Sequence, residues 1–557
     1  MLRISPLLFC VAFIIFSCKE KKSIGEKQIV QQPAQIDESA TEIIQGTISD
    51  FLHGSDPEAN FLNENSIGHI KAIYKQNDYL PLWSHDGKWT GTGDSLFSFI
   101  SNAAYYGLFP GDYHHKRLTE LRNTLDMDTA SKENKLDASL WAESDLYLSM
   151  AFVQMIKDLK IGRIRDSVAI KKDSLLGSDF VLQQLKSFQS TPDIESFAKG
   201  LEPAHAGYHQ LKTALHSFLP EADLRTYTYL NLKDSVHLRS ALQQRLIEDS
   251  IQIDSTLSDS AALVKAIKQY QKRKEIKQDG KITPTLINSL NETDTEKFIR
   301  VAITLDRYKQ LPDSLPAQHI WVNIPGYYLH LKENDTVRLK SKVVVGKSYT
   351  STPVLTSAIS DMITYPQWTI PESIIKKEIL PGLKKDPSYT LKKGFSLIDR
   401  NGTVVDPIFV DWSKYKTGIP YKVVQGSGDD NALGVIKFNF SNKYAVYLHD
   451  TNQRYLFSRK NRALSHGCVR VQNWDSLAYF ILNNDSIAGY KSIPVDTLKT
   501  WLSLKQKHVI PVKKRIPLYI RYFSCEGNEE GIVFYEDIYS DDKRLKERYF
   551  ANKSLNL

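Results

Sequence analysis

The sequence predicts a multidomain protein in which an α-helical part is followed by a mainly β domain. The chain has 557 residues, which allows three or four domains at roughly 150 residues each. Its apolar residues follow a mostly helical spacing over residues 43–250 and change to the alternation of strands after residue 318. Hydrophobic residues make up 41% and charged residues 24%, values that fit a globular protein and argue against a polytopic membrane protein.

The charged residues give no sign of a nucleic-acid surface. Lys and Arg number 72 and Asp and Glu 64, so the formal net charge is +8. The basic residues form no helix or stripe with interleaved aromatics, which a nucleic-acid groove requires. We therefore expect no nucleic-acid partner.

The first residues have the order of a secretory signal. Arg3 precedes an apolar run over residues 7–16, and the small residue Ser17 stands next to Cys18. This run is too short to span a bilayer. The four residues that end at Cys18, Ile-Phe-Ser-Cys, resemble a bacterial lipobox, although Phe at the second position before the cysteine is less usual.

The lipobox resemblance implies a lipoprotein signal peptide over residues 1–17 and diacylation of Cys18. The mature protein would then lie in the cell envelope, on the periplasmic side of a membrane, with the outer membrane as the preferred one. A plain cleaved signal and a buried helix are the alternatives. The polar residues 18–42 lack an apolar period and predict a flexible tether.

Residues 43–250 predict a helical domain without obvious chemistry. A long stretch without Gly or Pro runs from Leu136 to Leu159, and Gly162 ends it. Aromatic clusters in this part are more often packing than ligand sites, so we expect them in the core.

A small helical unit is predicted over residues 258–292. Leu263, Ile267 and Tyr270 fall on one helical face, and an Asp-Gly turn then leads to Thr283, an N-cap residue that is followed by proline. The unit resembles the small helical peptidoglycan-binding domain, with Tyr270 where that domain usually has Phe. A helical linker without a ligand is the alternative.

A β-dominated domain is predicted over residues 300–500. Alternating apolar residues predict five of its strands: 320–324, 327–331, 338–345, 435–440 and 444–449. The first two flank a Pro-Gly pair and therefore predict a hairpin.

An insertion over residues 373–419 interrupts these strands. It begins with an amphipathic helix over residues 373–380 and continues with many Lys, Gly and Pro residues, which predicts a mobile flap with little core of its own. A surface decoration is the alternative. Residues 501–557 form a C-terminal β extension whose strands, on either side of Glu526-Gly527-Asn528, we expect to close the sheet from its edge.

Two histidines stand near one cysteine in the β domain. Tyr447 and His449 are followed by residues 465–470, Ser-His-Gly-Cys-Val-Arg. A cysteine attacks carbonyl carbon as the thiolate, so it needs a nearby base or a cation that lowers its pKa from roughly 8.5. His449 and His466 are the local candidates. Alternate residues of a strand share a face, so Tyr447 and His449 should point the same way.

The residue before the cysteine is a glycine. Gly467 permits a tight turn that aims successive N–H groups at a developing oxyanion. His466 can donate a hydrogen bond there too, and Ser465 is expected to fix the loop.

These residues resemble the signature of the L,D-transpeptidases, the cysteine enzymes that cross-link bacterial peptidoglycan. That signature is a strand His, a loop, and then Ser-His-Gly-Cys-hydrophobic-Arg. Residues 431–438, 368–374 and 537–539 are similar to the large Gram-negative members, which combine a helical scaffold, the peptidoglycan-binding unit and a catalytic domain. In those enzymes an insertion caps the substrate, so the resemblance implies that residues 373–419 form a cap.

By position, the resemblance makes Cys468 the nucleophile and His449 the general base. It implies that a backbone carbonyl orients His449, so Asp450 is not assumed to be a triad member. An alternative for the pair is a buried thiol next to a core histidine. A zinc pair is the other alternative, but the third and fourth ligands that zinc needs are not apparent.

The remaining site residues also follow from the resemblance. Ser465, His466 and Gly467 would shape the oxyanion site. Arg470 would either brace the loop or meet a substrate carboxylate, and Tyr447 is a candidate wall of the substrate pocket.

The four cysteines exclude a disulfide scaffold. After processing, Cys468 and Cys525 would be the two free thiols, and we expect Cys525 to be inert. No metal or organic cofactor is expected, because a thiolate and an imidazole supply both the nucleophile and the proton transfer.

The resemblance implies a reaction on peptidoglycan. Cys468 would attack the carbonyl of the third stem residue of a tetrapeptide donor, expel the terminal D-Ala and hold a thioester. An amine of a neighbouring stem would form a 3-3 cross-link, whereas water would give an L,D-carboxypeptidase. A carbapenem should label the same cysteine. Such an enzyme serves peptidoglycan biosynthesis, cell-wall organization and cell shape; an inactive wall-binding lipoprotein is the alternative.

Overall fold

The computed structural model describes residues 24, 26–53, 61–130, 136–191, 193–551, 553 and 555. The predicted signal peptide and Cys18 lie outside these residues. The chain folds into two compact units: residues 1–202 together with 553–557, and residues 203–552.

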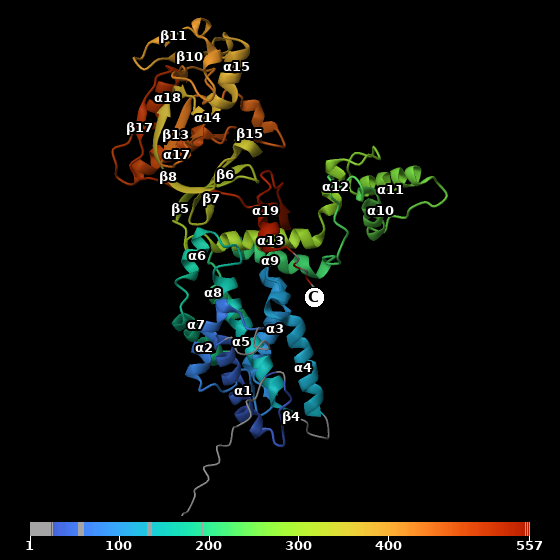
Figure 1. Ribbon diagram of the computed structural model, residues 1–557. Helices are drawn as coiled ribbons and strands as arrows, with labels where there is room; N and C mark the ends of the chain where they lie inside the picture. The colour runs from blue at the N-terminus through green and yellow to red at the C-terminus, as the bar shows by residue number, and fades with distance from the viewer. Residues whose placement is uncertain are drawn as a thin grey trace, which may run out of the picture. The chain divides into compact units, whose positions relative to one another are not determined.

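The first unit is mainly helical, and α5 (Ala138–Lys160) is its central helix (Figure 1). Almost every side chain of α5 is buried. The predicted long helix is therefore confirmed, and Gly162 follows its end with a left-handed φ of +87°. The other helices are α1 (Ala34–His53), α2 (Glu64–Gln76), α3 (Gly91–Ser101), α4 (His115–Ala130), α6 (Ser167–Asp173), α7 (Ser178–Ser190) and α8 (Ile194–Leu201).

The prediction of a flexible tether over residues 18–42 is wrong for its C-terminal part. A short strand, β1 (Ile29–Val30), pairs with β4 (Leu136–Asp137), and α1 begins at Ala34. Ile36 and Ala40 of this helix are fully buried. Two apolar residues four positions apart are too few to predict a helix in a polar stretch until the packing partner is known.

The helical prediction over residues 43–250 also crosses a domain boundary. Residues after Glu202 belong to the second unit, where α9 (Ala206–Phe218) packs on α13 (Asp294–Lys309). α10 (Leu238–Glu248) packs on α11 (Asp259–Arg273). Helical spacing continues across the boundary, so the sequence does not mark it.

The small helical unit has the predicted arrangement. α11 and α12 (Pro284–Asn291) share a core that contains Leu263, Ile267 and Tyr270. The hydroxyl of Thr283 accepts a hydrogen bond from the backbone N–H of Leu286 at 3.2 Å, which makes Thr283 the N-cap of α12. The predicted helix-turn-helix is thus confirmed.

The β domain is built on a ten-stranded sheet in the order β13-β14-β16-β7-β6-β5-β18-β8-β17, with β15 paired to β7. β13 also pairs with β8, so the path closes on itself. The predicted hairpin is confirmed as β5 and β6. The strands are β5 (Gln318–Asn323), β6 (Tyr328–Glu333), β7 (Thr336–Gly346), β8 (Leu355–Thr364), β13 (Ile436–Phe440), β14 (Leu448–His449), β15 (Ala463–Ser465), β16 (Val469–Val471), β17 (Val509–Pro511) and β18 (Pro517–Arg521).

One face of these strands forms the core of the β domain. Leu331, Phe438, Leu448 and Val469 are fully buried there. Two helices, α17 (Trp474–Ile487) and α18 (Val495–Ser503), contribute Leu477 and further apolar side chains to the same core. The alternate residues of the strands therefore face away from the core.

The predicted strand at 444–449 is shorter than expected. Only Leu448 and His449 pair as β14, because Ala445 has a left-handed φ of +55°. Oδ1 of Asn442 accepts hydrogen bonds from the backbone N–H of Tyr444 and Val446, at 3.0 and 3.1 Å. These bonds hold a turn where alternation alone predicts a strand.

The C-terminal extension differs from its prediction. β18 lies inside the sheet, between β5 and β8, rather than at an edge. The strands around residues 526–528 form a separate hairpin of β19 (Cys525–Asn528) and β20 (Gly531–Phe534), and α19 (Asp541–Tyr549) follows. Strand order depends on contacts between distant residues, which alternation does not reveal.

The insertion folds as a subdomain, called the cap below, that comprises residues 368–425 (Figure 1). It has its own four-stranded sheet and a core that includes Ile379, Leu383, Leu397 and Trp412. The prediction of a flap with little core is therefore wrong. The sequence does not reveal this core, because its apolar residues are scattered singly among lysines and glycines. The elements are β9 (Trp368–Thr369), α14 (Glu372–Ile374), a π-helical turn (Ile375–Ile379), α15 (Leu380–Lys385), α16 (Tyr389–Lys392), β10 (Phe395–Ile398), β11 (Val404–Val405) and β12 (Lys422–Gln425).

Every helix among the described residues is too short or too polar to cross a bilayer.

Candidate active site

Strand pairing brings the sequence-predicted residues together on the face turned away from the core. β14 and β16 run parallel, with His449 opposite Arg470. The preceding register pair is Leu448 and Val469. The backbone N–H of Val469 donates to the carbonyl of Tyr447 at 3.1 Å, which sets Tyr447 beside Cys468. Since alternate residues share a face, Tyr447, His449, Cys468 and Arg470 lie on the same side.

A lysine that the sequence analysis did not select joins this group. Lys437 of β13 is the register partner of His449. Its ammonium lies 3.9 Å from the ring centroid of Tyr447. Burial lowers the pKa of Lys437, and the charge of a Cys468 thiolate raises it. The alternation of Ile436, Phe438 and Phe440 into the core is the signal that could have placed Lys437 on the outer face.

The surroundings of Cys468 have opposing effects on the pKa of its thiol. Burial raises its pKa, whereas hydrogen bonds from Tyr447 and the charges of Lys437 and Arg470 lower it. The first effect is the largest, so the resting cysteine is a protonated thiol at neutral pH. The hydroxyl and cations around it favour the thiolate once a proton acceptor is present.

His449 is a neutral imidazole. Its side chain is 4% exposed, and burial, followed by the charge of Arg470, lowers its pKa to about 3. Hydrogen bonding with the backbone of Asp450 and Leu433 acts in the opposite direction. Nδ1 of His449 is buried without a hydrogen-bond partner among the described residues, so it is open to accept a proton.

Asp450 has other partners. Oδ2 accepts hydrogen bonds from the backbone N–H of Val435 at 3.1 Å and from Nη2 of Arg454 at 2.9 Å. Successive strand residues point to opposite faces, so Asp450 points away from the face that carries His449. The carboxylate therefore acts on Val435 and Arg454.

Ser465 organises the loop before the cysteine. Its hydroxyl donates to the carbonyl of Cys468 at 2.6 Å and accepts from the backbone N–H of Gly467 at 3.1 Å. Gly467 has a φ of +118°, which L side chains rarely adopt. The hydroxyl of Thr352 donates to the carbonyl of Gly467 at 2.9 Å and fixes the loop from the other side.

His466 points toward the cap. Its Nε2 lies 2.6 Å from Oε1 of Glu378, in the π-helical turn of the cap. The motif predicts that His466 lies at the oxyanion site, and the contact with Glu378 joins the same side chain to the cap. No periodicity links two residues so far apart in the chain, so Glu378 could not be found from the sequence.

The guanidinium of Arg470 has unused hydrogen-bonding capacity among the described residues. Nη1 donates to Oε1 of Gln453 at 2.9 Å, and Nε is buried without a partner among the described residues. Burial lowers the pKa of Arg470. A guanidinium beside a thiol, with no ion-pair partner among the described residues, is suited to hold an anionic group of a ligand.

A tyrosine of the C-terminal extension, Tyr539, contacts the residues that hold the cysteine loop. The hydroxyl of Tyr539 donates to the carbonyl of Gly346 at 2.7 Å and accepts from the backbone N–H of Thr352 at 3.1 Å. Thr352 in turn holds Gly467, so Tyr539 acts on the loop through one intermediate residue. Tyr539 lies in the segment 537–539 singled out in the sequence, but its role depends on this contact.

The second free thiol is remote from this chemistry. Cys525 is fully buried, and its sulfur donates to Oγ1 of Thr304 at 3.1 Å. Burial raises the pKa of Cys525 to about 12. A neutral, enclosed thiol is a poor nucleophile.

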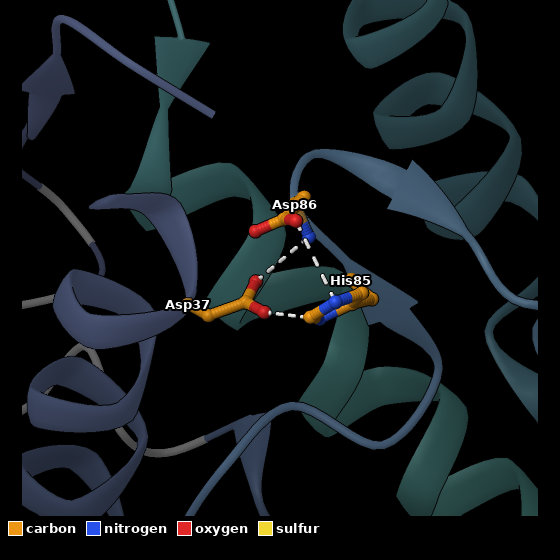
Figure 2. Close-up of side chains that lie close together, drawn as sticks. All are labelled: Asp37, His85 and Asp86. Carbon is orange, nitrogen blue, oxygen red and sulfur yellow. Dashed lines mark hydrogen bonds and ion pairs between the residues drawn. The ribbon is translucent and has the colours of Figure 1, made fainter. Parts of the chain in front are cut away.

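One cluster of the first unit has the donor set of a cation site. Asp37 of α1 approaches His85, the last residue of β2 (Ser84–His85), and Asp86, in the turn that leads to β3 (Lys88–Trp89), as Figure 2 shows. Nδ1 of His85 lies 2.6 Å from Oδ2 of Asp37, and the backbone N–H of Asp86 donates to Oδ1 at 3.1 Å. Both oxygens of Asp37 are thus used in tying the turn to α1, and this brace is the role that the contacts support.

Known proteins match both units. Residues 317–485 match the family model of YkuD, the L,D-transpeptidase catalytic domain, and residues 68–215 match that of the Scaffold domain. Over 246 residues the chain is 37% identical to the Haemophilus influenzae protein named "Putative L,D-transpeptidase". The alignment covers 44% of this chain and 48% of the relative, so the chain spans about half the length of the curated relative that it matches. The predicted resemblance and the predicted fold class, a helical part followed by a β domain, are confirmed.

Proposed function

We propose, on the premise that residues 317–485 form an L,D-transpeptidase catalytic domain, that the chain forms 3-3 cross-links in peptidoglycan with Cys468 as nucleophile and His449 as general base. One observation carries the assignment. The parallel pairing of β14 with β16 gathers a thiol, an imidazole and a guanidinium on one face of the sheet. A thiol and a nearby imidazole are the groups that acyl transfer through a thioester requires.

The first step transfers the donor acyl group to Cys468. The sulfur attacks the carbonyl carbon of the third stem residue, and the thiol proton passes to Nδ1 of His449. When the tetrahedral intermediate collapses, the bond to the nitrogen of the terminal D-Ala breaks, and that nitrogen takes the proton from His449. The products are a thioester on Cys468 and free D-Ala.

The second step transfers the acyl group to an amine on the third residue of a neighbouring stem. The amine attacks the thioester carbon, the carbon–sulfur bond breaks, and His449 moves the proton from the amine nitrogen to the sulfur. The thiol is restored and a 3-3 cross-link is formed. Water in place of the amine gives the L,D-carboxypeptidase reaction.

Binding of the donor can make the imidazole more basic. Burial and then the charge of Arg470 lower the pKa of His449. A substrate carboxylate that pairs with Arg470 offsets this charge, so binding of the donor raises the basicity of His449. Lys437 and Arg470 also favour the thiolate and the oxyanion that follow.

One backbone donor of the loop is better placed for the oxyanion than the other. The N–H of Gly467 is taken up by the hydroxyl of Ser465. The N–H of Cys468 makes no backbone hydrogen bond among the described residues. We therefore assign the oxyanion contact to the N–H of Cys468, with Ser465 and Gly467 holding its direction and Tyr447 walling the pocket.

The proposal includes a cellular location for the protein. Stem peptides lie outside the cytoplasm, which fits a signal peptide over residues 1–17 and a lipid anchor at Cys18 on the periplasmic side of a membrane. The helical unit over residues 258–292, with its resemblance to the peptidoglycan-binding domain, would hold the enzyme near the wall.

Incubation of the purified chain with disaccharide-tetrapeptide tests the proposal. Mass spectrometry should find a cross-linked dimer and free D-Ala. Tripeptide without dimer would identify a carboxypeptidase, and unchanged substrate would identify an inactive binding protein.

A further inference from the structure

A cavity, called the β5–β6 cavity below, lies outside the group around Cys468. Its volume is about 620 Å³, within the range of small-molecule sites. It is bounded by β5, β6, α9, α13 and β19. The lining residues used below are Gly207, Tyr308, His319, Trp321, Tyr328 and His330.

The outer faces of two paired strands build one wall. In β5, Ile320 and Val322 enter the core, so His319 and Trp321 face the other way. Antiparallel pairing puts Trp321 opposite His330 of β6. Trp321 is 5% exposed, so its ring is largely covered, and the half-buried rings of Tyr328 and His330 are the aromatic surfaces open to the cavity.

Two imidazoles supply unused hydrogen-bonding atoms. Nδ1 of His319 bonds with the carbonyl of Pro316 at 2.8 Å, but Nε2 is buried without a partner among the described residues. His330 stacks on Tyr328, with ring centroids 4.2 Å apart, and its nitrogens bond to no described residue. Burial and then Lys332 lower the pKa of His330 to about 4, so this ring is neutral at neutral pH and offers one donor and one acceptor.

The opposite wall is held rigidly. Gly207 of α9 lies against the hydroxyl of Tyr308, where a Cβ atom would collide with it. The Glu526 carboxylate of β19 is occupied by hydrogen bonds from Tyr328, from the amide of Asn323 at 3.1 Å and from the hydroxyl of Tyr535 at 2.8 Å. A preformed cavity needs little ordering when a ligand binds.

The charges at this cavity do not favour an ionic ligand. The Glu526 carboxylate is already saturated, and the cavity is lined by both Lys332 and Asp335. Aromatic faces with neutral donors and acceptors match a ring that is apolar on its faces and hydroxylated at its edge.

We infer that the β5–β6 cavity binds an uncharged sugar ring. The choice of an N-acetylhexosamine, the sugar class of the peptidoglycan glycan strand, rests on the proposed function. The sugar face would pack on the rings of Tyr328 and His330, and its hydroxyl and amide groups would meet Nε2 of His319 and the ring nitrogens of His330. The cavity would thus hold glycan while Cys468 reacts with stem peptides.

Calorimetric titration of the purified chain with N,N′-diacetylchitobiose tests this inference. The wild type should bind, and His330→Leu should bind about tenfold more weakly, because hydrogen bonds worth roughly 1.4 kcal/mol are lost. His508→Leu is the matched control, since His508 also stacks on an aromatic ring, that of Trp501, with ring centroids 3.8 Å apart, but lies outside the cavity. Its binding should equal that of the wild type.

A second variant tests the cavity independently, in case His330→Leu does not fold. Val337→Trp places a large side chain in the cavity lining without removing a hydrogen bond, and it should also weaken sugar binding. Thermal melts would confirm that both variants are folded. No binding by the wild type, or equal binding by folded His330→Leu and Val337→Trp, would overturn the inference.

Carbapenem labelling of Cys468 in the same samples separates this inference from the proposed function. The cavity variants should label normally. Sugar binding without any labelling would contradict the proposed chemistry and leave the cavity assignment standing.

Discussion

Nε2 of His466 lies 2.6 Å from Oε1 of Glu378, so the loop that carries Cys468 is joined directly to the cap. The cap has its own core and can act as one body. This polar contact therefore links the position of the cap to the residue two places before the nucleophile. Substrate closure by such elements can set turnover.

Glu378→Gln should weaken the link between cap and loop. We expect kcat/KM for disaccharide-tetrapeptide to fall about threefold to fivefold, since a hydrogen bond contributes about 1 kcal/mol. Alkylation of Cys468 by iodoacetamide, which needs no cap, should be unchanged. Lys377→Gln is the control, because Lys377 is its exposed neighbour in the same turn. Equal turnover of the Glu378→Gln and wild-type proteins would show that the contact does not position the cap.

Lys437→Met should make Cys468 less acidic. Burial raises the pKa of the Cys468 thiol and the charge of Lys437 lowers it, so removal of Lys437 should shift the midpoint of the alkylation rate to higher pH. Lys437→Arg should retain most of the effect of the charge. Lys443→Met is the matched control, because Lys443 also lies over a tyrosine ring, Tyr444, at 5.3 Å. A profile unchanged in Lys437→Met would exclude an electrostatic role.

His449→Ala should cost far more activity than Asp450→Asn. General-base catalysis contributes roughly 10²- to 10⁴-fold, so a loss of several hundredfold is expected for the histidine, measured as the rate of D-Ala release. Asp450 bonds with Val435 and Arg454, so Asp450→Asn should mainly lower the melting temperature. Equal losses of activity in two folded variants would mean that Asp450 orients the base.

Lipidation should depend on Cys18. The mature protein should begin at that residue and partition with membranes, because two acyl chains give stable anchoring. Cys18→Ala should yield an unmodified precursor, detected by intact mass. A native protein that is soluble in the periplasm and starts elsewhere would remove the lipid anchor and leave the enzyme proposal intact.

Local patterns predicted the parts of the structure that local interactions determine. The long helix α5, the β5–β6 hairpin and the Thr283 cap follow from spacing, turn residues and capping. The proximity of His449 and Cys468 in the fold was expected from a motif, and the parallel pairing of β14 with β16 supplies its physical basis.

Contacts between distant residues account for what the sequence did not predict. β18 lies inside the sheet because it pairs with β5 and β8, more than one hundred and fifty residues earlier in the chain. Glu378 reaches His466 across 88 residues, and Tyr539 reaches Thr352 across 187 residues. Neither alternation nor composition carries such information.

Replacement of Cys468 by serine tests the assigned chemistry most directly. The hydroxyl is similar in volume but a far weaker nucleophile beside the same base. Wild-type protein incubated with a carbapenem should gain one covalent adduct on the peptide that contains Cys468, and Cys468→Ser should gain none and form no dimer from disaccharide-tetrapeptide. Equal labelling of folded Cys468→Ser at another residue, with dimer still formed, would contradict the assignment of Cys468 as the nucleophile.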